Sequence, residues 1–367
     1  MDKFKKVFRR LPDPRAANAR HDLLEVLVIA LAAVLCGAET CSDMAEFGQA
    51  KEGLLRRFLR LEHGVPSHDT FSRVFRLLKP EAFEAAFRRF MATFAKTNRL
   101  NLTGVVAIDG KALRGAFERG SRTEPLQMVN VWAVEARMSL AQQKAAGRNE
   151  TAGALEVLAL LSLEGCIVTA DALHCHRGMA KTILDRGGDY VLAIKANRGP
   201  LFKAVVSQFV RSGKRSATKL IEPSTHDRQE SRRATIMRNT SLAAIHGFPG
   251  VVAIGRVTSR RRLHGSRADA PAVRYYLLSK YMSAKWLLQV TRSHWTIENQ
   301  LHWVLDVHFN EDGNRTRKDH GPENLAILRR LALNMLRSHP HKASIRRKIK
   351  RAGWDDSFLM ATFSHMR

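Results

Sequence analysis

The spacing of hydrophobic residues changes near residue 104, and this change constrains the fold more than any other feature of the chain. Residues 21–95 repeat apolar side chains every three or four positions, which is typical of amphipathic helices. From residue 104 onward, short apolar runs rich in β-branched side chains appear instead. We therefore predict an all-helical N-terminal domain over residues 1–98, followed by a domain that contains a β-sheet.

The order of elements in the second domain indicates a mixed sheet. Three strand-like runs are followed by a helical stretch, a fourth run, a second helix and a fifth run, at residues 104–110, 126–136, 139–145, 151–163, 166–172, 177–188 and 189–197. Strands and helices that alternate in this way are typical of α/β folds. The predicted fold class is therefore α/β, with this domain extending over residues 99–337.

Three further regions complete the predicted organisation. Residues 205–280 are basic and alternate in polarity, which predicts a β-rich insertion into the α/β domain. Helical patterns return from Ser283 to Val307 and at about 323–337. Residues 338–367 are rich in lysine and arginine, and we expect them to form a basic C-terminal tail.

The composition restricts the class of protein and its partner. Hydrophobic residues make up 45% of the chain, enough for a buried core, so an intrinsically disordered protein is excluded. Lysine and arginine number 61 against 34 acids, which leaves a formal net charge of +27. A surplus of this size indicates a polyanionic partner.

No segment indicates a membrane or an exported protein. The most apolar early run, Leu23 to Cys36, spans 14 residues, whereas a membrane span needs roughly 20. The N-terminus is basic but lacks the apolar stretch and cleavage site of a signal peptide. The four cysteines are too few to crosslink a chain of this length. We expect a cytoplasmic protein with no membrane partner.

Three acids are candidates for chemistry. Asp109 and Asp171 each follow an apolar run, and ligands of open α/β sheets bind at the carboxyl ends of strands. The predicted helix near residue 300 carries polar side chains at every fourth position: His294, Glu298, His302 and Asp306. The alternative is that each aspartate only opens a turn and that this polar ridge is only a solvated face.

Clustered carboxylates need either a proton on one of them or a cation between them. Two close carboxylates repel each other, and a bound divalent cation lets both remain ionised. Oxygen ligands favour magnesium. Zinc is an alternative with two possible ligand sets: His174, Cys175 and His176, or His294, Glu298 and His302. Neither set has a characteristic zinc spacing with distant partners, so we favour magnesium.

Several longer motifs occur along nearly the whole chain. The N-terminal region contains LPDPRAANARHDLLEVLVIALAAVLCGAE and GVPSHDTFSRVF, and the later motifs are IDGKALRG, GCIVTADALHCHRGMAKTI, GGDYVLAIKANRGPL, HDRQESR and RSHWTIENQLHWVLDVHFNED. In this order they resemble the DDE transposases of bacterial insertion sequences, and within them the branch of H-repeat-associated proteins. The last motif is the most specific.

The resemblance implies a fold, a catalytic triad and a cofactor. The fold is ribonuclease H-like, a mixed sheet with helices and a β-rich insertion before the helix that carries the glutamate. The triad would be Asp109, Asp171 and Glu298, acting both as catalytic residues and as ligands of two Mg²⁺ ions, for which Mn²⁺ can substitute. Related transposases often have Tyr, Arg and Lys where this chain has Thr291, His294 and Leu305, so those roles are not carried over.

Basic and polar residues near the acids are candidates for phosphate contacts. The predicted DNA-binding residues are Lys111, Arg114, Lys195, Arg292, His294 and Asn299. The alternative for each is an ordinary surface charge. Further cations cluster between Arg337 and Gly353 and, in the insertion, at Arg256, Arg260, Arg261, Arg262 and Arg267. Phosphate contacts of this kind give salt-dependent affinity without reading sequence.

The function that the resemblance implies is cleavage and joining of DNA at insertion-sequence ends. We expect a homodimer on DNA, associated with the nucleoid, because two element ends must be handled together. The alternatives are a catalytically inactive DNA-binding regulator derived from a transposase, and a nuclease that never joins strands. The helical N-terminal domain either reads the element ends or serves dimerisation, and the sequence leaves both open.

Overall fold

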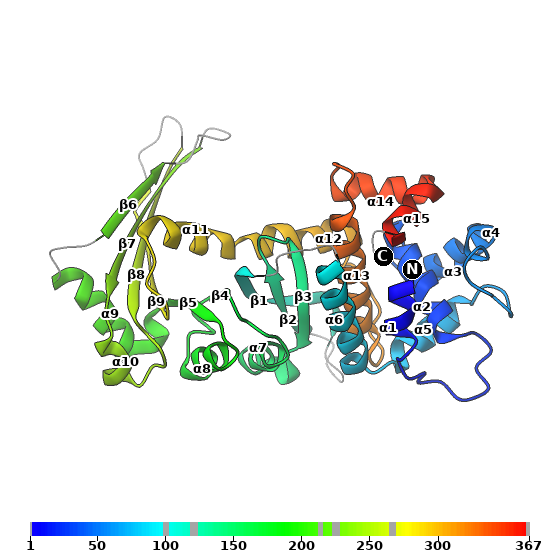
Figure 1. Ribbon diagram of the computed structural model, residues 1–367, viewed down its shortest axis with the longest axis horizontal. Helices are drawn as coiled ribbons and strands as arrows, with labels where there is room; N and C mark the ends of the chain where they lie inside the picture. Colours follow the sequence, from blue (N-terminus) through cyan, green and yellow to red (C-terminus); the bar gives the residue numbers. More distant parts are fainter. Residues whose placement is uncertain are drawn as a thin grey trace.

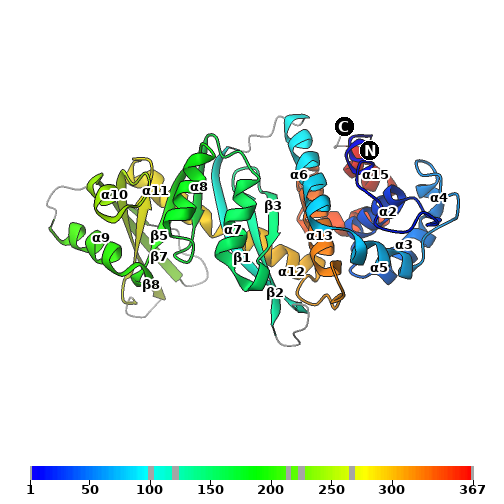
Figure 2. The same cartoon turned by 90° about the horizontal axis from the view of Figure 1, so that it is seen from below.

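The computed structural model describes residues 2–97, 103–117, 124–211, 216–221, 228–263 and 269–364. Helices pack together in one half of the molecule, and a sheet with helices on both faces forms the other half (Figure 1). Both chain ends lie in the helical half (Figure 2). The predicted domain boundary between residues 98 and 99 falls within 98–102, which lie outside the described residues.

The regular elements of the described N-terminal region are helices, in agreement with the hydrophobic spacing. They are α1 (Asp2–Phe8), α2 (Leu23–Leu35), α3 (Cys41–Ala50), α4 (Glu52–Leu55), α5 (His68–Leu77) and α6 (Pro80–Thr97). Except for Glu25, every residue of α2 is buried, and the Asp22 side chain caps its first turn. The apolar run of the sequence is therefore a core helix. Within the described residues, no helix is both long and apolar enough to cross a membrane.

The C-terminal segment joins this helical core. It contains α13 (Gly321–Ser338), α14 (Ile345–Trp354) and α15 (Asp356–Ser364). α13 contacts α2, α5 and α6, and α14 contacts α2, α12 and α13. The segment expected to be a basic tail is thus helical and packed from residue 345 to 364. The apolar positions Ile349, Ala352 and Leu359 explain this difference, because they give each helix a face that the core buries.

The sheet contains nine strands within the described residues, in the order β3-β2-β1-β4-β5-β9-β8-β7-β6. They are β1 (Gly104–Phe117), β2 (Pro125–Ala133), β3 (Met138–Lys144), β4 (Cys166–Ala170), β5 (Asp189–Ile194), β6 (Ser216–Ile221), β7 (Arg228–Arg238), β8 (Ala253–Leu263) and β9 (Ala272–Leu278). β4 runs parallel to β1 and β5, and the other neighbouring pairs are antiparallel. The sheet is therefore mixed, as predicted.

Helices cover both faces of the sheet because its central strands are apolar on both sides. Along β1, Val106 and Ile108 join the core formed with α7 and α8, whereas Val105 joins the core under α11. The helices of this half are α7 (Glu150–Ala159), α8 (Arg177–Asp185), α9 (Gly199–Arg211), α10 (Ser241–His246) and α11 (Ala284–His294). Two short 3₁₀ turns, at Ala146–Arg148 and Ala196–Arg198, precede α7 and α9.

The order of β1, β2, β3, α7, β4, α8 and β5 agrees with the predicted order of elements. An antiparallel three-stranded meander followed by parallel strands with intervening helices is the arrangement of the ribonuclease H-like fold. One detail of the prediction is wrong: β1 does not end at residue 110 but continues to Phe117. It continues because β2 keeps pairing with it beyond that point, through Leu113 opposite Leu126.

The insertion extends the same sheet instead of forming a separate one. β9 pairs with β5 from Val191 opposite Leu278 to Ile194 opposite Tyr275, and β8, β7 and β6 follow outward. The predicted range of 205–280 begins inside α9, so the insertion also contains helices. Residues 212–215, 222–227 and 264–268, and with them Arg267, lie outside the described residues.

One long helical region crosses from the insertion to the helical half (Figure 1). It consists of α11, a π-helical segment at Ile297–His302, and α12 (Trp303–Phe309). Its helical character was predicted, but its π-helical middle was not. Segments of this kind occur frequently at functional sites because they change which side chains share a face. Glu298 and His302 both belong to this segment.

Candidate active site

The register between two parallel strands brings Asp109 and Asp171 to the same level of the sheet. β1 and β4 pair Ala107 with Thr169, so the residues two positions further along reach the same edge. Asp171 follows the end of β4, and its Oδ1 accepts a hydrogen bond from the Leu173 amide at 2.9 Å. Asp171 therefore opens a turn, as the alternative proposed, and also lies beside Asp109.

A cavity of about 560 Å³ is lined by all three acids that the sequence singled out. Asp109 and Asp171 reach it from the sheet, and Glu298 reaches it from the π-helical segment. Further side chains of its wall are Lys195, Phe202, Arg274, His294 and Trp295. Acids that are up to 189 positions apart in the chain thus meet at one concave surface.

The electrostatic environment of Asp109 reflects this convergence. Burial raises the pKa of Asp109 to about 7, and the negative charges of Glu298, Glu150 and Asp171 contribute to the rise in that order. The basic side chain nearest to it is His302, whose Nδ1 lies 3.6 Å from Asp109 Oδ2. Burial lowers the pKa of His302 to about 3, so this imidazole is neutral. His302 therefore does not offset the negative charge of these acids.

Glu150 is a fourth acid near the cavity, and the sequence did not predict it. It begins α7, and its Oε1 accepts a hydrogen bond from Nε2 of the buried His174 at 3.1 Å. A Cβ atom at position 110 would clash with the Glu150 carboxyl group, so Gly110 leaves the room in which this group approaches β1. The glycine directly after Asp109 was the available signal, because it permits a close approach.

A buried chain of hydrogen bonds orients His302 against Asp109. Its Nε2 lies 3.4 Å from Nδ2 of Asn130, the residue opposite Asp109 in the β1–β2 ladder. Arg330 Nε donates to Asn130 Oδ1 at 2.8 Å. Because a guanidinium only donates, the Asn130 amide must direct its own N–H groups toward the imidazole. Nε2 therefore accepts, and the ring proton resides on Nδ1, which faces Asp109.

The same region contains a cluster in which every charge has an opposite partner within 4 Å. Arg330 and Glu311 are fully buried and form an ion pair at 2.9 Å. Lys111 Nζ lies 2.7 Å from Asp306, 3.0 Å from Asp312 and 3.8 Å from Glu311. This cluster of Lys111, Arg330 and their acids is called the paired cluster below.

The structure places Lys111 and Arg114 outside the acid cavity. The Lys111 side chain is only 6% exposed and its ammonium faces acids of the paired cluster, so it is not available to DNA. Arg114 is exposed, but it pairs with Asp312 at 3.5 Å and does not line the acid cavity. The other four predicted DNA-binding residues lie at the cavity or next to it.

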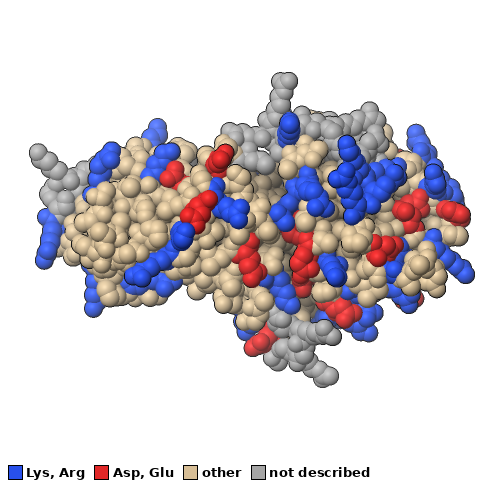
Figure 3. Space-filling view, turned by 60° about the horizontal axis from the view of Figure 1, so that its bottom comes forward, with Lys and Arg blue, Asp and Glu red and all other residues tan. Residues whose placement is uncertain are grey.

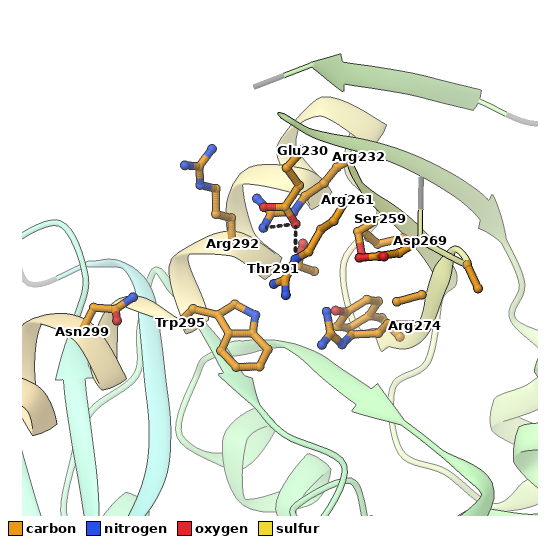
Figure 4. Close-up of a pocket in the computed structure, with 14 residues that line it drawn as sticks. Glu230, Arg232, Ser259, Arg261, Asp269, Arg274, Thr291, Arg292, Trp295 and Asn299 are labelled. Atoms are coloured by element: carbon orange, nitrogen blue, oxygen red, sulfur yellow. Dashed lines mark hydrogen bonds and ion pairs between the residues drawn. The ribbon is translucent and has the colours of Figure 1, made fainter. Parts of the chain in front are cut away.

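Lys195 and His294 line the acid cavity itself. Burial lowers the pKa of His294 to about 4, and its Nδ1 lies 3.3 Å from the Thr169 hydroxyl. Arg292 and Asn299 line an adjacent cavity of about 440 Å³, between α11 and the strands of the insertion (Figure 4).

This adjacent cavity is rich in arginine. Glu230 pairs with Arg232 at 3.0 Å and with Arg261 at 3.6 Å, which Figure 4 marks by dashed lines. The Arg274 guanidinium lies 5.1 Å from the ring centre of Trp295, and both residues line the two cavities. A continuous polar and basic wall therefore extends from the acids to the insertion.

The donor set of the acid cavity fits a divalent cation. Carboxylate oxygens are the preferred ligands of magnesium and manganese, and a cation would offset the burial and the like charges that raise the pKa of Asp109. In the described part of the chain, no three His, Cys, Asp or Glu side chains already lie close enough to share one ion. This holds for both zinc alternatives as well, and burial raises the pKa of the Cys175 thiol to about 12, which disfavours a thiolate ligand.

Basic side chains predominate on the molecular surface. On the face in Figure 3, lysine and arginine occur at both ends of the molecule and form the larger groups over its helical half. This distribution agrees with the net charge of +27 and with a polyanionic partner.

Comparison with known proteins identifies the family. A family model described as Transposase DDE domain matches residues 101–335, and one described as DDE_Tnp_1-associated matches residues 5–91. YncI of Escherichia coli, named a putative transposase, is 31% identical over 95% of this chain and 91% of its own length. YhhI of Escherichia coli, named an H repeat-associated putative transposase, is 29% identical over 96% of each chain.

One further relative has a different name. YbfQ of Escherichia coli, named an inactive transposase, is 38% identical over 17% of this chain and 76% of its own length. The family model for the DDE domain covers more than half of the chain, and it spans Asp109, Asp171 and Glu298. The chain therefore belongs to the DDE transposase family, and this membership implies DNA as the partner and a divalent metal ion as the cofactor.

Proposed function

We propose that this protein cuts and joins DNA phosphodiesters at the ends of an insertion sequence. The observation that carries the proposal is the shared cavity of Asp109, Asp171 and Glu298 in a member of the DDE transposase family. In this proposal the three carboxylates are the catalytic triad and hold two Mg²⁺ ions, for which Mn²⁺ substitutes. Glu298 is exposed, so its side chain is able to close toward the two aspartates.

The reaction consists of two displacements at phosphorus. In the first, water attacks the phosphodiester at the element end, the bond to the 3′-oxygen breaks, and a 3′-hydroxyl is released. In the second, this hydroxyl attacks a target phosphodiester and displaces a 3′-oxygen of the target strand. Divalent cations bound to the triad would activate the attacking oxygen and stabilise the leaving one.

The surrounding residues hold the triad and the DNA. His302 directs its Nδ1 proton toward Asp109 and limits the rotation of that carboxylate. Lys195 and His294 contact the DNA at the cavity, and Arg292 and Asn299 contact it beside the insertion. The helical half reads the element ends or joins two copies, and the active species is a homodimer on DNA within the nucleoid.

Substitution of the triad tests this proposal. Asp109→Asn, Asp171→Asn and Glu298→Gln should each abolish metal-dependent cleavage of an element-end duplex, while binding of that duplex in EDTA persists. Asp185→Asn is the matched control, because Asp185 is an exposed acid on α8 that pairs only with Lys181 in the described structure. Cleavage at the wild-type rate by any of the three triad variants would refute the assignment.

An inactive DNA-binding regulator is the second candidate function. It is favoured by one observation, the similarity of part of the chain to a relative named inactive. An assay with element-end duplex, Mg²⁺ and supercoiled target DNA separates the candidates. Binding without cleavage indicates the regulator, cleavage without joined product indicates a nuclease, and joined product supports the transposase.

A further inference from the structure

The seven lysines and arginines between Arg337 and Gly353 fall into two groups in the structure. Two of them bind within the protein. Arg337 donates to the carbonyls of Arg137 and Gln300, and its guanidinium lies 4.5 Å from the ring centre of Trp132. Lys348 is buried and donates to the carbonyls of Leu336 and His339 at 2.7 and 2.8 Å. These two cations attach α14 and the end of α13 to their neighbours.

The other five cations are exposed and share one hollow of the surface. They are Lys342, Arg346, Arg347, Lys350 and Arg351, and we call them together the basic α14 face. They line an open cavity of about 630 Å³ with His341 and Trp354, and no carboxylate of the described residues lines it. The nearby acid Asp355 is already paired with Arg351 at 3.4 Å. The indole of Trp354 is 78% exposed at the end of this face.

The stability of α14 does not account for these charges. Arg346 and Lys350, and likewise Arg347 and Arg351, are like charges one helical turn apart, and each such pair destabilises a helix by about 0.2 to 0.5 kcal/mol. The first turn of α14 contains no acid, and its cations oppose the helix dipole. The helix forms because Ser344 caps it and the core buries its opposite side. The exposed cations therefore indicate binding of an anionic partner.

We propose that the basic α14 face binds the phosphate backbone of duplex DNA, as a second DNA contact separate from the acid cavity. The identity of the partner rests on the proposed function, in which DNA is the substrate. The five exposed cations complement the charge of a polyanion, and the fixed position of α14 suits the regular spacing of phosphates along duplex DNA. An anionic membrane fits less well, because an interfacial helix inserts an apolar face and that face of α14 is buried in the core.

A double substitution tests this proposal with the full-length protein. Arg346→Gln with Lys350→Gln removes two charges from the face and leaves Arg351, which lies over Phe358, in place. In EDTA, the slope of log affinity for a long duplex against log salt should fall in magnitude by about two, and affinity at low salt should fall about tenfold. Lys181→Gln with Lys203→Gln is the matched control, because these two exposed lysines lie on α8 and α9; it should retain the wild-type slope.

A chemical footprint locates the contact directly. Bound duplex should protect Lys342 and Lys350 from acetylation in the wild-type protein, and Lys181 and Lys203 should stay reactive. Circular dichroism confirms that the double variant is folded. The proposal would be overturned if the double variant kept the wild-type salt slope and if Lys342 and Lys350 of the wild-type protein stayed reactive in the presence of duplex. It would also be overturned if the double variant lost binding to anionic vesicles but bound DNA as the wild type does.

The binding assay also separates this proposal from the catalytic one. It contains no metal ion, so weaker binding by the α14 variant supports the second contact even if the wild-type protein never cleaves. The opposite outcome has two parts: the triad substitutions abolish metal-dependent cleavage, and the α14 variant binds DNA as the wild type does. This outcome would support the transposase proposal and refute the second DNA contact.

Discussion

Asp109 and Lys111 lie two residues apart on the same face of β1, yet their electrostatic environments are opposite. Around Asp109, burial and three further acids raise the pKa of the carboxyl group to about 7. Around Lys111, three carboxylates lie within 4 Å of the ammonium. One strand thus separates a region of excess negative charge from a region where charges are paired.

This difference distinguishes the paired cluster, which stabilises the fold, from the acid cavity, which is the candidate for chemistry. The paired cluster connects β1 to α12 and α13, and each of its charges has an opposite partner within 4 Å. In the acid cavity, burial and neighbouring acids disfavour the ionised form of Asp109, which costs stability unless a cation binds. Asn130 and His302 connect the two regions, because Asn130 accepts from Arg330 and faces the imidazole beside Asp109.

The largest effect should come from breaking the paired cluster. Arg330→Met removes the ion pair of the buried Glu311 and leaves Lys111 at 3.8 Å, so the free energy of unfolding should fall by about 3 to 5 kcal/mol. Urea unfolding followed by circular dichroism measures this loss. The double variant Arg330→Met with Glu311→Leu should recover much of it, because no acid is then left without its arginine. A loss under about 1 kcal/mol for the single variant would show that the Arg330–Glu311 pair does not stabilise the fold.

A smaller effect of opposite sign is expected in the acid cavity. The pKa of the Asp109 carboxyl is about 7 in the folded state against 3.8 ordinarily, so the folded state binds the extra proton between these values. Stability therefore declines as pH rises through this window. In EDTA, the free energy of unfolding of Asp109→Asn should exceed that of the wild type by about 2 to 4 kcal/mol at pH 8, and the two should differ little near pH 4.

Urea unfolding at several pH values measures this difference, and added Mg²⁺ provides the second arm. The ion should stabilise wild type more than Asp109→Asn at pH 8, because the variant lacks one carboxylate ligand. Equal stability of the two proteins at pH 8 in EDTA would show that Asp109 carries no excess charge.

The smallest effect on stability should come from a cation at the cavity wall. Lys195→Ala removes an exposed side chain, so the free energy of unfolding should change by less than about 0.5 kcal/mol. Strand transfer at low salt should nevertheless fall roughly tenfold, because a phosphate contact is lost. Lys203→Ala, an exposed lysine on α9, serves as the control. Unchanged strand transfer by Lys195→Ala would remove this residue from the DNA contact.

Much of the fold was predictable because its signals are local. The hydrophobic period changes within a few residues of Gly104, and the β1-to-β5 order follows from it. α14 and α15 were not predicted, because the many cations of this segment mask the apolar spacing of Ile345, Ile349 and Ala352. The π-helical segment around Glu298 has no local signal of this kind, and the sequence predicted a continuous helix there.

The candidate site was predictable only in part. The resemblance to the family directed attention to Asp109, Asp171 and Glu298, and these three residues line one cavity. Glu150 was not found, because its approach to Asp109 depends on how α7 packs against β1 and β2. The sequence predicted that Lys111 contacts DNA because it closely follows Asp109. Its actual partners, Asp306 and Asp312, lie 195 and 201 positions away.

The sequence by itself determined the kind and order of the elements, the basic character of the protein and the identity of the three acids. Hydrophobic period and residue type are properties of short segments, so they are visible before folding. Only the tertiary structure decided which charges are paired and which remain exposed to a ligand. The energy of a charge depends on its burial and on neighbours from distant segments, and folding alone brings those neighbours together.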